Sequence, residues 1–541
     1  MLARLDGVLA ALDSGGGRLV LVRGSAGIGK SAVLHEVARR AAAAGVAVAS
    51  GSCPEADTPP VFWPWLQVFR ELVETGGAEA VTAAFKPYGN VIGLLDRSLA
   101  GLVPLPLPEP VADLELSRTR LFHGLASGVA AFAASRPLVV LLDDMHWADA
   151  ASMQLFALLA RHLATAPVML VAAHRDDMPA SSAFSRALDR LATVSGVEEI
   201  TLGGLDRDAV AACVQAIAGR TVAPEVAAVL HARTGGNPFF LGELVRMLFA
   251  ERTLDDVAVA AERLPRRVQE VVGRRLARLP EQTRAVLAVA AVAGREFPLG
   301  LLERAIQLEQ ALLFDVVEAA IVAGLLAEDT ADTGLLRLRF SHDLVRQTIY
   351  DDLSGLRRAR LHAQMVTALQ ATPGADPLQV ARHARAAVPV TGPRAALGHL
   401  ISAAEWARGR LAFEQAEQLL GTAAGLLVAM PAGEERDRQE LEVRTRLGFL
   451  QQMLHGYAAA PAREQLEAAS ALLRRLPLDE AGVRALWHCA GGYWINAQFG
   501  QALGLADAAA ARARDDEPAA VLAVESIRGA VAWFTGRTAE A

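Results

Sequence analysis

The chain has little cysteine and almost no lysine. Its three cysteines, Cys53, Cys213 and Cys489, are too far apart for a metal site, and an odd, sparse set is untypical of a secreted disulfide scaffold. No uncharged apolar run reaches the ~18 residues that span a bilayer, and the acid-containing start MLARLDGVLAALD does not resemble a signal peptide. These absences favour a cytoplasmic protein. Lys30 and Lys86 are the only lysines among 53 basic residues, so a lysine here needs a specific reason.

Length, composition and charge limit the class of protein. A chain of 541 residues predicts three or four domains at roughly 150 residues each. An apolar content of 52% with 21% charged residues excludes wholesale disorder. A net charge of −7 disfavours a protein that wraps nucleic acid through bulk charge.

Residues 1–205 show the pattern of an α/β domain. Short apolar runs rich in valine and leucine alternate with amphipathic stretches, as expected for parallel strands buried on both faces. One such stretch, 30–44, has an apolar stripe and ends at Gly45, which predicts a helix. The aromatic segment 62–65 has no obvious role other than core packing. Five strands are expected, at 18–22, 46–51, 138–143, 168–173 and 198–202.

Residues 206–262 and 263–355 predict two smaller domains. The first has no strand pattern and is expected to be a helical lid, with Asp206 as a helix cap and a break at 234–238. The second contains helical patterns at 280–294, near Leu299 and at 310–324. A two-stranded ribbon at 325–328 and 335–340 follows them. Three helices and a hairpin predict a winged helix.

Residues 356–541 are expected to be helical throughout, with a recurring turn. Gly409, Gly456, Ala497 and Gly536 occupy similar turns, spaced by 47, 41 and 39 residues. This period exceeds the ~34 residues of the tetratricopeptide repeat but suits a solenoid of helix pairs. An irregular alanine-rich bundle is the alternative. Because the sequence stops where a further helix is expected, we expect it to be a fragment.

The strongest local motif lies between the first expected strand and helix. It has the pattern G-x-x-x-x-G-K-[ST], in which backbone N–H groups and the helix N-terminus bind phosphate oxygens. Lys30 would add a compact charge, for which the planar fork of arginine is a poor substitute, and Ser31 would bind Mg²⁺. A glycine-rich turn without phosphate binding is the alternative. The motif comprises Gly24, Ser25, Ala26, Gly27, Ile28, Gly29, Lys30 and Ser31.

Two adjacent carboxylates end the expected strand at 138–143. In the Walker-B pattern Asp143 holds Mg²⁺, while Asp144 stands where a general base orients the attacking water. Capping of the next helix would explain only one of these acids, and Asp149 suits that role better. His146 and Trp147 are expected either to pack on each other or to contact a neighbouring module.

Three further residues are candidates with equally plain alternatives. Arg175 follows the fourth expected strand and would reach the phosphates from the same sheet edge, but it could equally be a solvated arginine. By itself His342 is more often a structural histidine, and Pro238 a helix breaker.

With these residues the chain resembles the STAND class, the signal-transduction ATPases with numerous domains. It is most similar to the large ATP-binding regulators of the LuxR type, which carry an AAA-type ATPase domain, and to their cyclase- or kinase-linked relatives. The resemblance covers nearly the whole chain. It rests on residues 24–31, the string Leu-Asp-Asp-x-His-Trp-Ala-Asp ending at Asp149, residues 174–177, 235–240 and 339–343, and the helical repeats.

The resemblance implies a role for each candidate. Pro238 corresponds to the lid proline that contacts adenine, Arg175 to a sensor arginine, and His342 to the histidine that reaches the β-phosphate in the closed, ADP-bound form. ATP or ADP and Mg²⁺ are the expected cofactors. The Val-Gly-Arg-Glu string that cradles adenine and an output domain are not in this sequence, which leaves the ATP affinity and the output open.

Three functions follow from this pattern. The first is a molecular switch that self-associates with ATP, resets by slow hydrolysis and senses a ligand or partner through its repeats. It would control transcription, contacting DNA only through a missing output domain, or regulate a cyclase or kinase module. The second is an ATPase that turns over continuously on DNA, and the third is a passive scaffold with a degenerate site. The intact Lys30, Ser31 and Asp143 argue against the scaffold.

Overall fold

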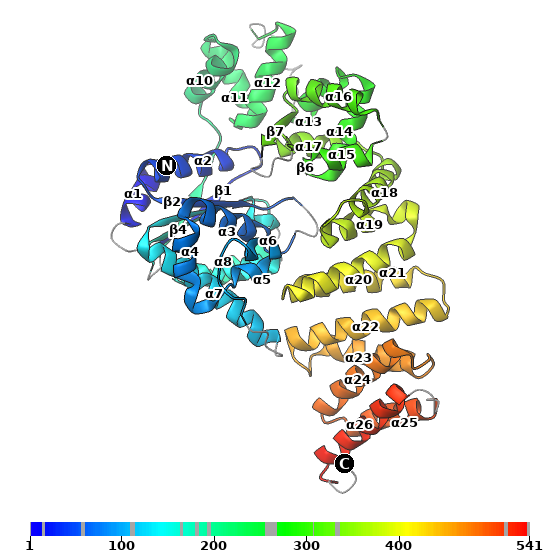
Figure 1. Ribbon diagram of the computed structural model, residues 1–541. Coiled ribbons are helices and arrows are strands. Elements are labelled where there is room, and N and C mark those ends of the chain that lie inside the picture. The colour runs from blue at the N-terminus through cyan, green and yellow to red at the C-terminus, as the bar shows by residue number, and fades with distance from the viewer. Residues whose placement is uncertain are drawn as a thin grey trace. The chain divides into compact units, whose positions relative to one another are not determined.

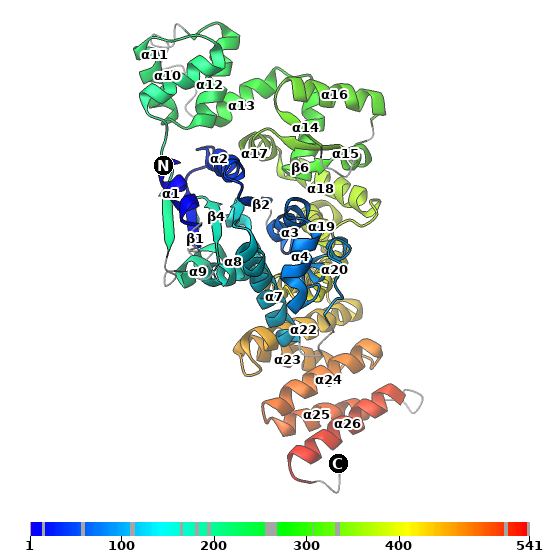
Figure 2. The same cartoon turned by 60° about the vertical axis from the view of Figure 1, so that its left-hand side comes forward.

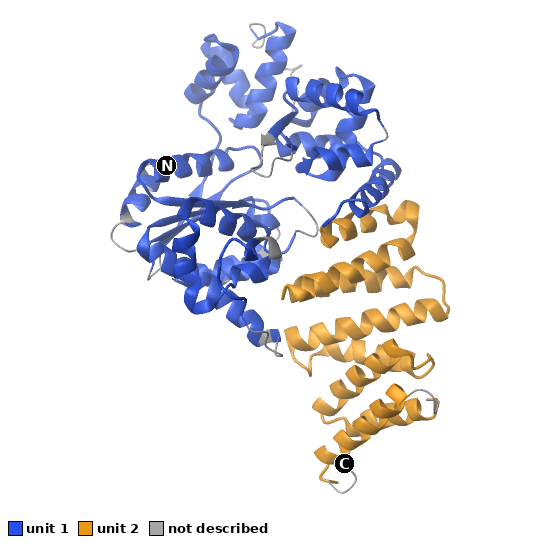
Figure 3. Ribbon diagram, in the orientation of Figure 1, with its two compact units in different colours: residues 1–375 blue, residues 376–541 orange. Residues whose placement is uncertain are grey.

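The computed structural model describes the chain in two compact units. Unit 1 comprises residues 1–375 and unit 2 residues 376–541 (Figure 3). The described residues are 2–12, 17–55, 60–108, 114–162, 166–178, 183–191, 196–254, 268–306, 308–330, 336–512 and 518–537. None of the helices in these ranges combines the length and apolar character needed to cross a membrane.

A five-stranded parallel sheet forms the centre of the first domain, as predicted. The strands lie in the order β2-β3-β4-β1-β5, and β3 and β4 are almost wholly buried. Since all five run the same way, the residues that follow β1, β3 and β4 meet at one edge of the sheet. The strands are β1 (Arg18–Arg23), β2 (Ala47–Ser52), β3 (Leu138–Asp143), β4 (Val168–His174) and β5 (Val197–Thr201).

Helices cover this sheet, and several of them were not predicted. The core joins α1 and α2 to the strands, and α2 ends before Gly45, which has a φ of 76°. A helical insertion, α3 to α7, separates β2 from β3 (Figure 2). Its Trp65 is fully buried and donates to Ser152 O over 3.0 Å, which supports the core-packing interpretation of the aromatic segment. The helices are α1 (Leu2–Ala11), α2 (Lys30–Ala43), α3 (Trp63–Gly76), α4 (Ala78–Phe85), η2 (Lys86–Tyr88), α5 (Ile92–Leu95), α6 (Arg97–Ala100), α7 (Leu114–Ser135), η3 (Met145–Trp147), α8 (Ala150–His162) and α9 (Ala183–Leu191).

The lid consists of three helices with their own apolar core. They are α10 (Arg207–Ala218), α11 (Pro224–Thr234) and α12 (Pro238–Glu251) (Figure 1). Asp206 caps α10 as predicted, because its carboxylate accepts from Ala209 N–H. The expected domain boundary near residue 262 lies outside the described residues.

A winged helix follows the lid, and it contains one more strand than predicted. Its antiparallel sheet has the order β6-β8-β7, and β6 pairs Glu296 with Arg339. Residues 331–335, which include most of the expected hairpin connection, lie outside the described residues. α18 packs against α14 and α15. The elements are α13 (Val268–Ala277), α14 (Glu281–Ala293), β6 (Glu296–Pro298), α15 (Leu299–Ala305), α16 (Gln310–Val322), β7 (Leu326–Thr330), β8 (Leu336–Phe340), α17 (Asp343–Asp351) and α18 (Gly355–Gln370).

Unit 2 is a stack of helices in which neighbours along the chain pack on one another. The predicted turns around Gly409, Gly456 and Ala497 join α20 to α21, α22 to α23 and α24 to α25, and Gly536 follows α26. This sequential packing supports a stack of helices rather than an irregular bundle. The helices are α19 (Pro377–Thr391), α20 (Pro393–Gly409), α21 (Phe413–Val428), α22 (Glu434–His455), α23 (Ala460–Leu473), α24 (Glu480–Ile495), α25 (Phe499–Ala510) and α26 (Pro518–Phe534).

Candidate nucleotide site

The glycine-rich loop connects the end of β1 to the first turn of α2. Gly27 and Gly29 have φ angles of 75° and 106°, which side chains with a Cβ rarely adopt. Gly29 is also the residue at the N-terminus of α2, and it caps the helix with no side chain. The free N–H groups of the first turn therefore face the loop, as an anion site requires.

Lys30 folds back into its own loop. Its ammonium donates to Gly24 O over 2.9 Å and to Ser25 O over 3.0 Å, and only 7% of the residue is exposed. Burial lowers its pKa, while Asp144 and Asp143 act in the opposite direction. The charge thus lies where a phosphate group cradled by this loop would meet it.

Ser31 and Asp143 bring two hard oxygen atoms together. Ser31 Oγ donates to Asp143 Oδ2 over 2.5 Å, although the residues are 112 positions apart. A hydroxyl and a carboxylate are ligands that Mg²⁺ accepts alongside phosphate oxygens and water. The two side chains therefore fit the predicted metal site.

Asp144 stands next to this pair in an unusual conformation. Its φ of 52° and ψ of 36° are left-handed, which costs a residue with a Cβ about 1 kcal/mol and is found most often at functional positions. Its N–H donates to Asp143 Oδ1 over 2.8 Å. Burial and then the neighbouring charge of Asp143 raise the pKa of Asp144 to about 6.

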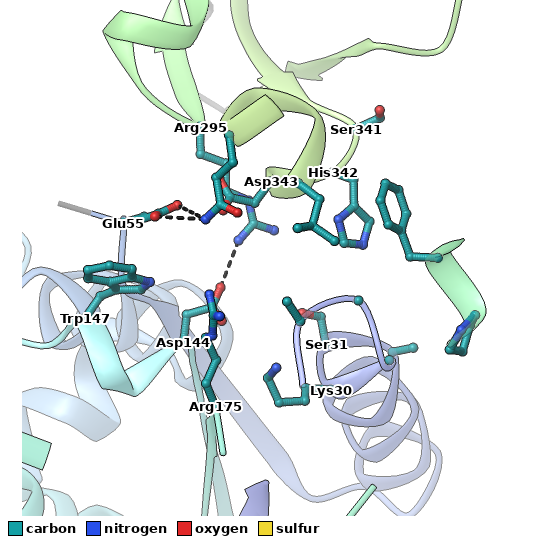
Figure 4. A pocket seen from close by; sticks show the side chains of 18 of the residues that line it. Lys30, Ser31, Glu55, Asp144, Trp147, Arg175, Arg295, Ser341, His342 and Asp343 are labelled. Atoms are coloured by element: carbon teal, nitrogen blue, oxygen red, sulfur yellow. Dashed lines mark hydrogen bonds and ion pairs between the residues drawn. The ribbon is translucent and has the colours of Figure 1, made fainter. Parts of the chain in front are cut away.

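A cavity of about 430 Å³ collects most of the predicted residues (Figure 4). Asp144 and Arg175 approach it from the sheet edge, and Pro238 and His342 from the lid and the winged helix. Gly24, Ser25, Ile28 and Asp143 belong to the same loop and strand but do not line it. The predicted residues on its wall are Ala26, Gly27, Gly29, Lys30, Ser31, Asp144, Arg175, Pro238 and His342.

The lid contacts the glycine-rich loop through its last helix. Asn237 caps α12 by accepting from Phe239 N–H and Phe240 N–H, and its amide donates to Ala26 O over 2.9 Å. Phe239 N–H donates to Gly27 O over 3.3 Å. A Cβ on Gly27 would come within 2.9 Å of Phe239 Cβ, so a glycine is also needed for this close approach.

His342 occupies the N-cap position of α17 and stacks on the lid. Its ring lies 3.6 Å from that of Phe239, between centroids, with an interplanar angle of 25°. Burial, followed by the charge of Arg295, lowers the pKa of His342 to about 4, so the imidazole is neutral at pH 7. Its Nδ1 is buried without a hydrogen-bond partner among the described residues.

The remaining candidates have defined partners. Arg175 reaches the cavity, but its guanidinium is bonded to Asp177 over 2.8 and 2.6 Å. His146 and Trp147 pack together with ring centroids 5.3 Å apart, and both line the cavity. Asp149 caps α8: it accepts from Ala151 N–H and Ser152 N–H, which supports the capping role expected for it.

Among the cavity residues that were not predicted as site residues, two form ion pairs with distant parts of the chain. Arg295, just before β6, donates through Nη1 to Asp144 Oδ2 over 3.0 Å. Glu55, after β2, accepts from Gln347 over 2.9 Å and pairs with Arg346 of α17. Neither belongs to a recognisable sequence pattern, and each meets its partner only through the fold.

We expect the contact between the Glu55 carboxyl and α17 to depend on pH. Burial and then a hydrogen bond to the Asp343 carboxylate raise its pKa from 4.5 to about 7, against the opposing charge of Arg346. Because the pKa of Glu55 is higher in the folded than in the unfolded chain, the protonated carboxyl favours the folded state. This contribution to the free energy of unfolding is complete below pH 4.5 and is lost as the pH rises through 7. Between pH 5 and pH 8, wild type should therefore lose about 1 to 2 kcal/mol of stability relative to Glu55→Gln, measured by thermal unfolding. Glu74→Gln, on the exposed side of α3, should show no such trend.

A comparison with known protein families agrees with an ATPase domain in the first part of the chain. Residues 1–171 match the family model described as AAA ATPase domain. A curated relative, an uncharacterized protein of Rhizobium meliloti (strain 1021), is 27% identical over 525 residues, covering 91% of this chain and 48% of that protein. The chain therefore spans about half the length of this curated relative.

Three solved structures are similar to the chain at low identity. A STAND protein with a tetratricopeptide repeat sensor from Pyrococcus horikoshii is 15% identical, with a TM-score of 0.42 over 98% of this chain and 74% of that one. The ORC2 protein of Aeropyrum pernix is 14% identical, with a TM-score of 0.30 over 65% and 92%. A single-substitution variant of RuvB from Thermotoga maritima is 17% identical, with a TM-score of 0.28 over 65% and 94%.

The parallel sheet, the glycine-rich loop and the paired acids agree with the family match. Together with the match over residues 1–171, they identify an AAA-type ATPase domain in this chain.

Proposed function

We propose that unit 1 binds ATP and ADP with Mg²⁺ and acts as a switch that slow hydrolysis resets. The observation that carries this proposal is the cavity itself, which the glycine-rich loop, Asp144, the lid and the winged helix line together. A ligand that fills it contacts all three parts of unit 1. Such a ligand can favour one arrangement of these parts over another in proportion to its difference in affinity.

Each residue has a defined task in this proposal. The loop and Lys30 bind the phosphates, while Pro238 contacts the adenine and Arg175 the terminal phosphate. When bound, Mg²⁺ would be held by Ser31 and Asp143 and would neutralise charge on the phosphates. Asp144 orients the water that attacks the γ-phosphorus and accepts its proton.

The helical repeats of unit 2 complete the proposal as a sensor. Stacked helix pairs provide an extended surface for a ligand or partner, which is the usual function of solenoids. We propose that this signal is combined with the nucleotide state of unit 1 to control transcription, with self-association in the ATP-bound state.

Nucleotide titration of the full 541-residue chain tests the proposal. ATP and ADP, each with Mg²⁺, should raise its thermal unfolding midpoint in a saturable manner. Turnover should be much slower than the ~10 per second that is typical of enzymes. A chain that neither binds nor responds to adenine nucleotides would refute the proposal.

His342 should set the preference between the two nucleotides. Removing its ring in His342→Ala deletes the stack on Phe239 and one hydrogen-bonding group at the cavity. We expect the preference for ADP over ATP to fall about 2- to 13-fold, the worth of one ordinary hydrogen bond, with more self-association in sedimentation. His123→Ala, exposed on α7, is the control. If ADP still holds the His342 variant monomeric with unchanged preference, this role is wrong.

A further inference from the structure

An arginine from the winged helix holds Asp144. Arg295 Nη1 and Asp144 Oδ2 are 3.0 Å apart, although 151 positions separate the residues in the chain. Arg295 directly precedes β6, whereas Asp144 directly follows β3. Figure 4 shows the two side chains meeting at the cavity that Lys30 and Ser31 also line.

This ion pair leaves one carboxylate oxygen available. Arg295 engages Oδ2 only, and Oδ1 has no hydrogen-bond partner among the described residues. The Asp144 side chain remains 23% exposed and lines the cavity. The main chain is fixed as well, because Asp144 N–H donates to Asp143 Oδ1. Backbone and guanidinium together therefore determine where the free oxygen points.

Arg295 is distinct from the other arginines of the cavity. The guanidinium of Arg175 is bonded to Asp177. Arg346, which lies behind the cavity wall and does not line it, is bonded to Glu55 and Asp343. Arg339 lies beside Arg295 in the winged-helix sheet, since it pairs with Glu296 across β6 and β8. Its side chain also lines the cavity, but it is exposed instead of bonded to Asp144.

We propose that Arg295 is a positioning residue for ATP hydrolysis, which holds the Asp144 carboxylate so that Oδ1 faces the attacking water. This inference rests on the proposed function. In the step, the water oxygen bonds to the γ-phosphorus while the bond from that phosphorus to the β,γ-bridging oxygen breaks. One water proton passes to Asp144 and then to solvent, and ADP and inorganic phosphate leave.

Because Arg295 belongs to the winged helix, the rate of hydrolysis depends on whether the winged helix is docked on the ATPase domain. The arginine reaches Asp144 only while the winged helix is docked on the ATPase domain. Hydrolysis is therefore efficient in the docked arrangement and slow once the winged helix has moved away. A chain that has undocked keeps its triphosphate longer.

Single-turnover hydrolysis by the full chain tests this inference. Arg295→Met removes the charge and the hydrogen bond but keeps the apolar stem, and Arg295→Lys keeps the charge. We expect Arg295→Met to slow the hydrolysis step at least tenfold, with the Kd for a fluorescent ATP analogue within threefold of wild type. Arg295→Lys should recover most of the rate. Arg304→Met, at an exposed arginine of α15 that does not line the cavity, should stay within twofold of wild type. In an Asp144→Asn background, Arg295→Met should cause no further loss.

Several results would overturn the inference while leaving nucleotide binding intact. The inference fails if Arg295→Met hydrolyses ATP as fast as or faster than wild type, or if its Kd for the nucleotide weakens as much as its rate falls. It also fails if Arg295→Lys does not recover the rate, or if wild type binds ATP without any turnover. A wild type that does not bind ATP would instead refute the proposed function.

Discussion

Lys30→Ala should weaken ATP binding about 10- to 150-fold. The substitution removes a charge-assisted hydrogen bond to phosphate, which is worth roughly 1.5 to 3 kcal/mol. Lys30 lies within the loop, bonded to Gly24 O and Ser25 O, so its ammonium is already in position for an incoming phosphate. Calorimetric titration with ATP and Mg²⁺ measures the change directly.

The chain contains a natural control for this experiment. Lys86 is the only other lysine, and it is exposed in η2, away from the cavity walls. Lys86→Ala should leave the Kd unchanged. Equal affinities for wild type and Lys30→Ala would mean that the loop does not bind the phosphates.

Asp144→Asn should reduce the rate of ATP hydrolysis about 10²- to 10⁴-fold, the usual contribution of a general base. The amide has nearly the same shape as the carboxylate but cannot accept the proton of the attacking water. Because Asp144 is not a proposed ligand of the phosphates, the Kd for ATP should change little. Phosphate release under single-turnover conditions measures the rate.

A neighbouring acid provides the matched control for Asp144. Asp176 is exposed near the same sheet edge but does not line the cavity, so Asp176→Asn removes one negative charge without touching the proposed base. Its rate should stay within about twofold of wild type. Unimpaired hydrolysis by Asp144→Asn would exclude Asp144 as the base.

The sequence predicted those parts of the site that are determined locally. The glycine-rich motif and the paired acids follow apolar strands, and parallel strands bring their ends to one edge. The positions of these motifs in the sequence therefore predict that four side chains lie close together, those of Lys30, Ser31, Asp143 and Asp144. All five strands were located to within two residues. The central strands β1, β3 and β4 are the clearest, because they are apolar runs buried on both faces of the sheet.

The contacts across domains could not be predicted in this way. Arg295 pairs with Asp144, 151 residues away, and Glu55 pairs with Arg346, 291 residues away. No local sequence pattern marks Arg295 or Glu55. The strand β6 was missed because three residues ending in a proline are too few to show alternation. The lid amide of Asn237 acts as an ordinary helix cap, and its second bond, to Ala26 O, depends on how the lid docks.

The antiparallel pairing of β6 and β8 has a mechanical consequence. Phe340 N–H donates to Arg295 O over 2.9 Å, and His342 follows Phe340 by two positions. Arg295, which holds Asp144, and His342 are therefore attached to the same rigid sheet. A rotation of this sheet would withdraw the side chains of Arg295 and His342 from the cavity in a single motion, and the contacts of both would be lost together. Intermediate positions, with one group engaged and the other released, are disfavoured. In the proposed function, the winged helix would therefore switch between two positions rather than respond gradually.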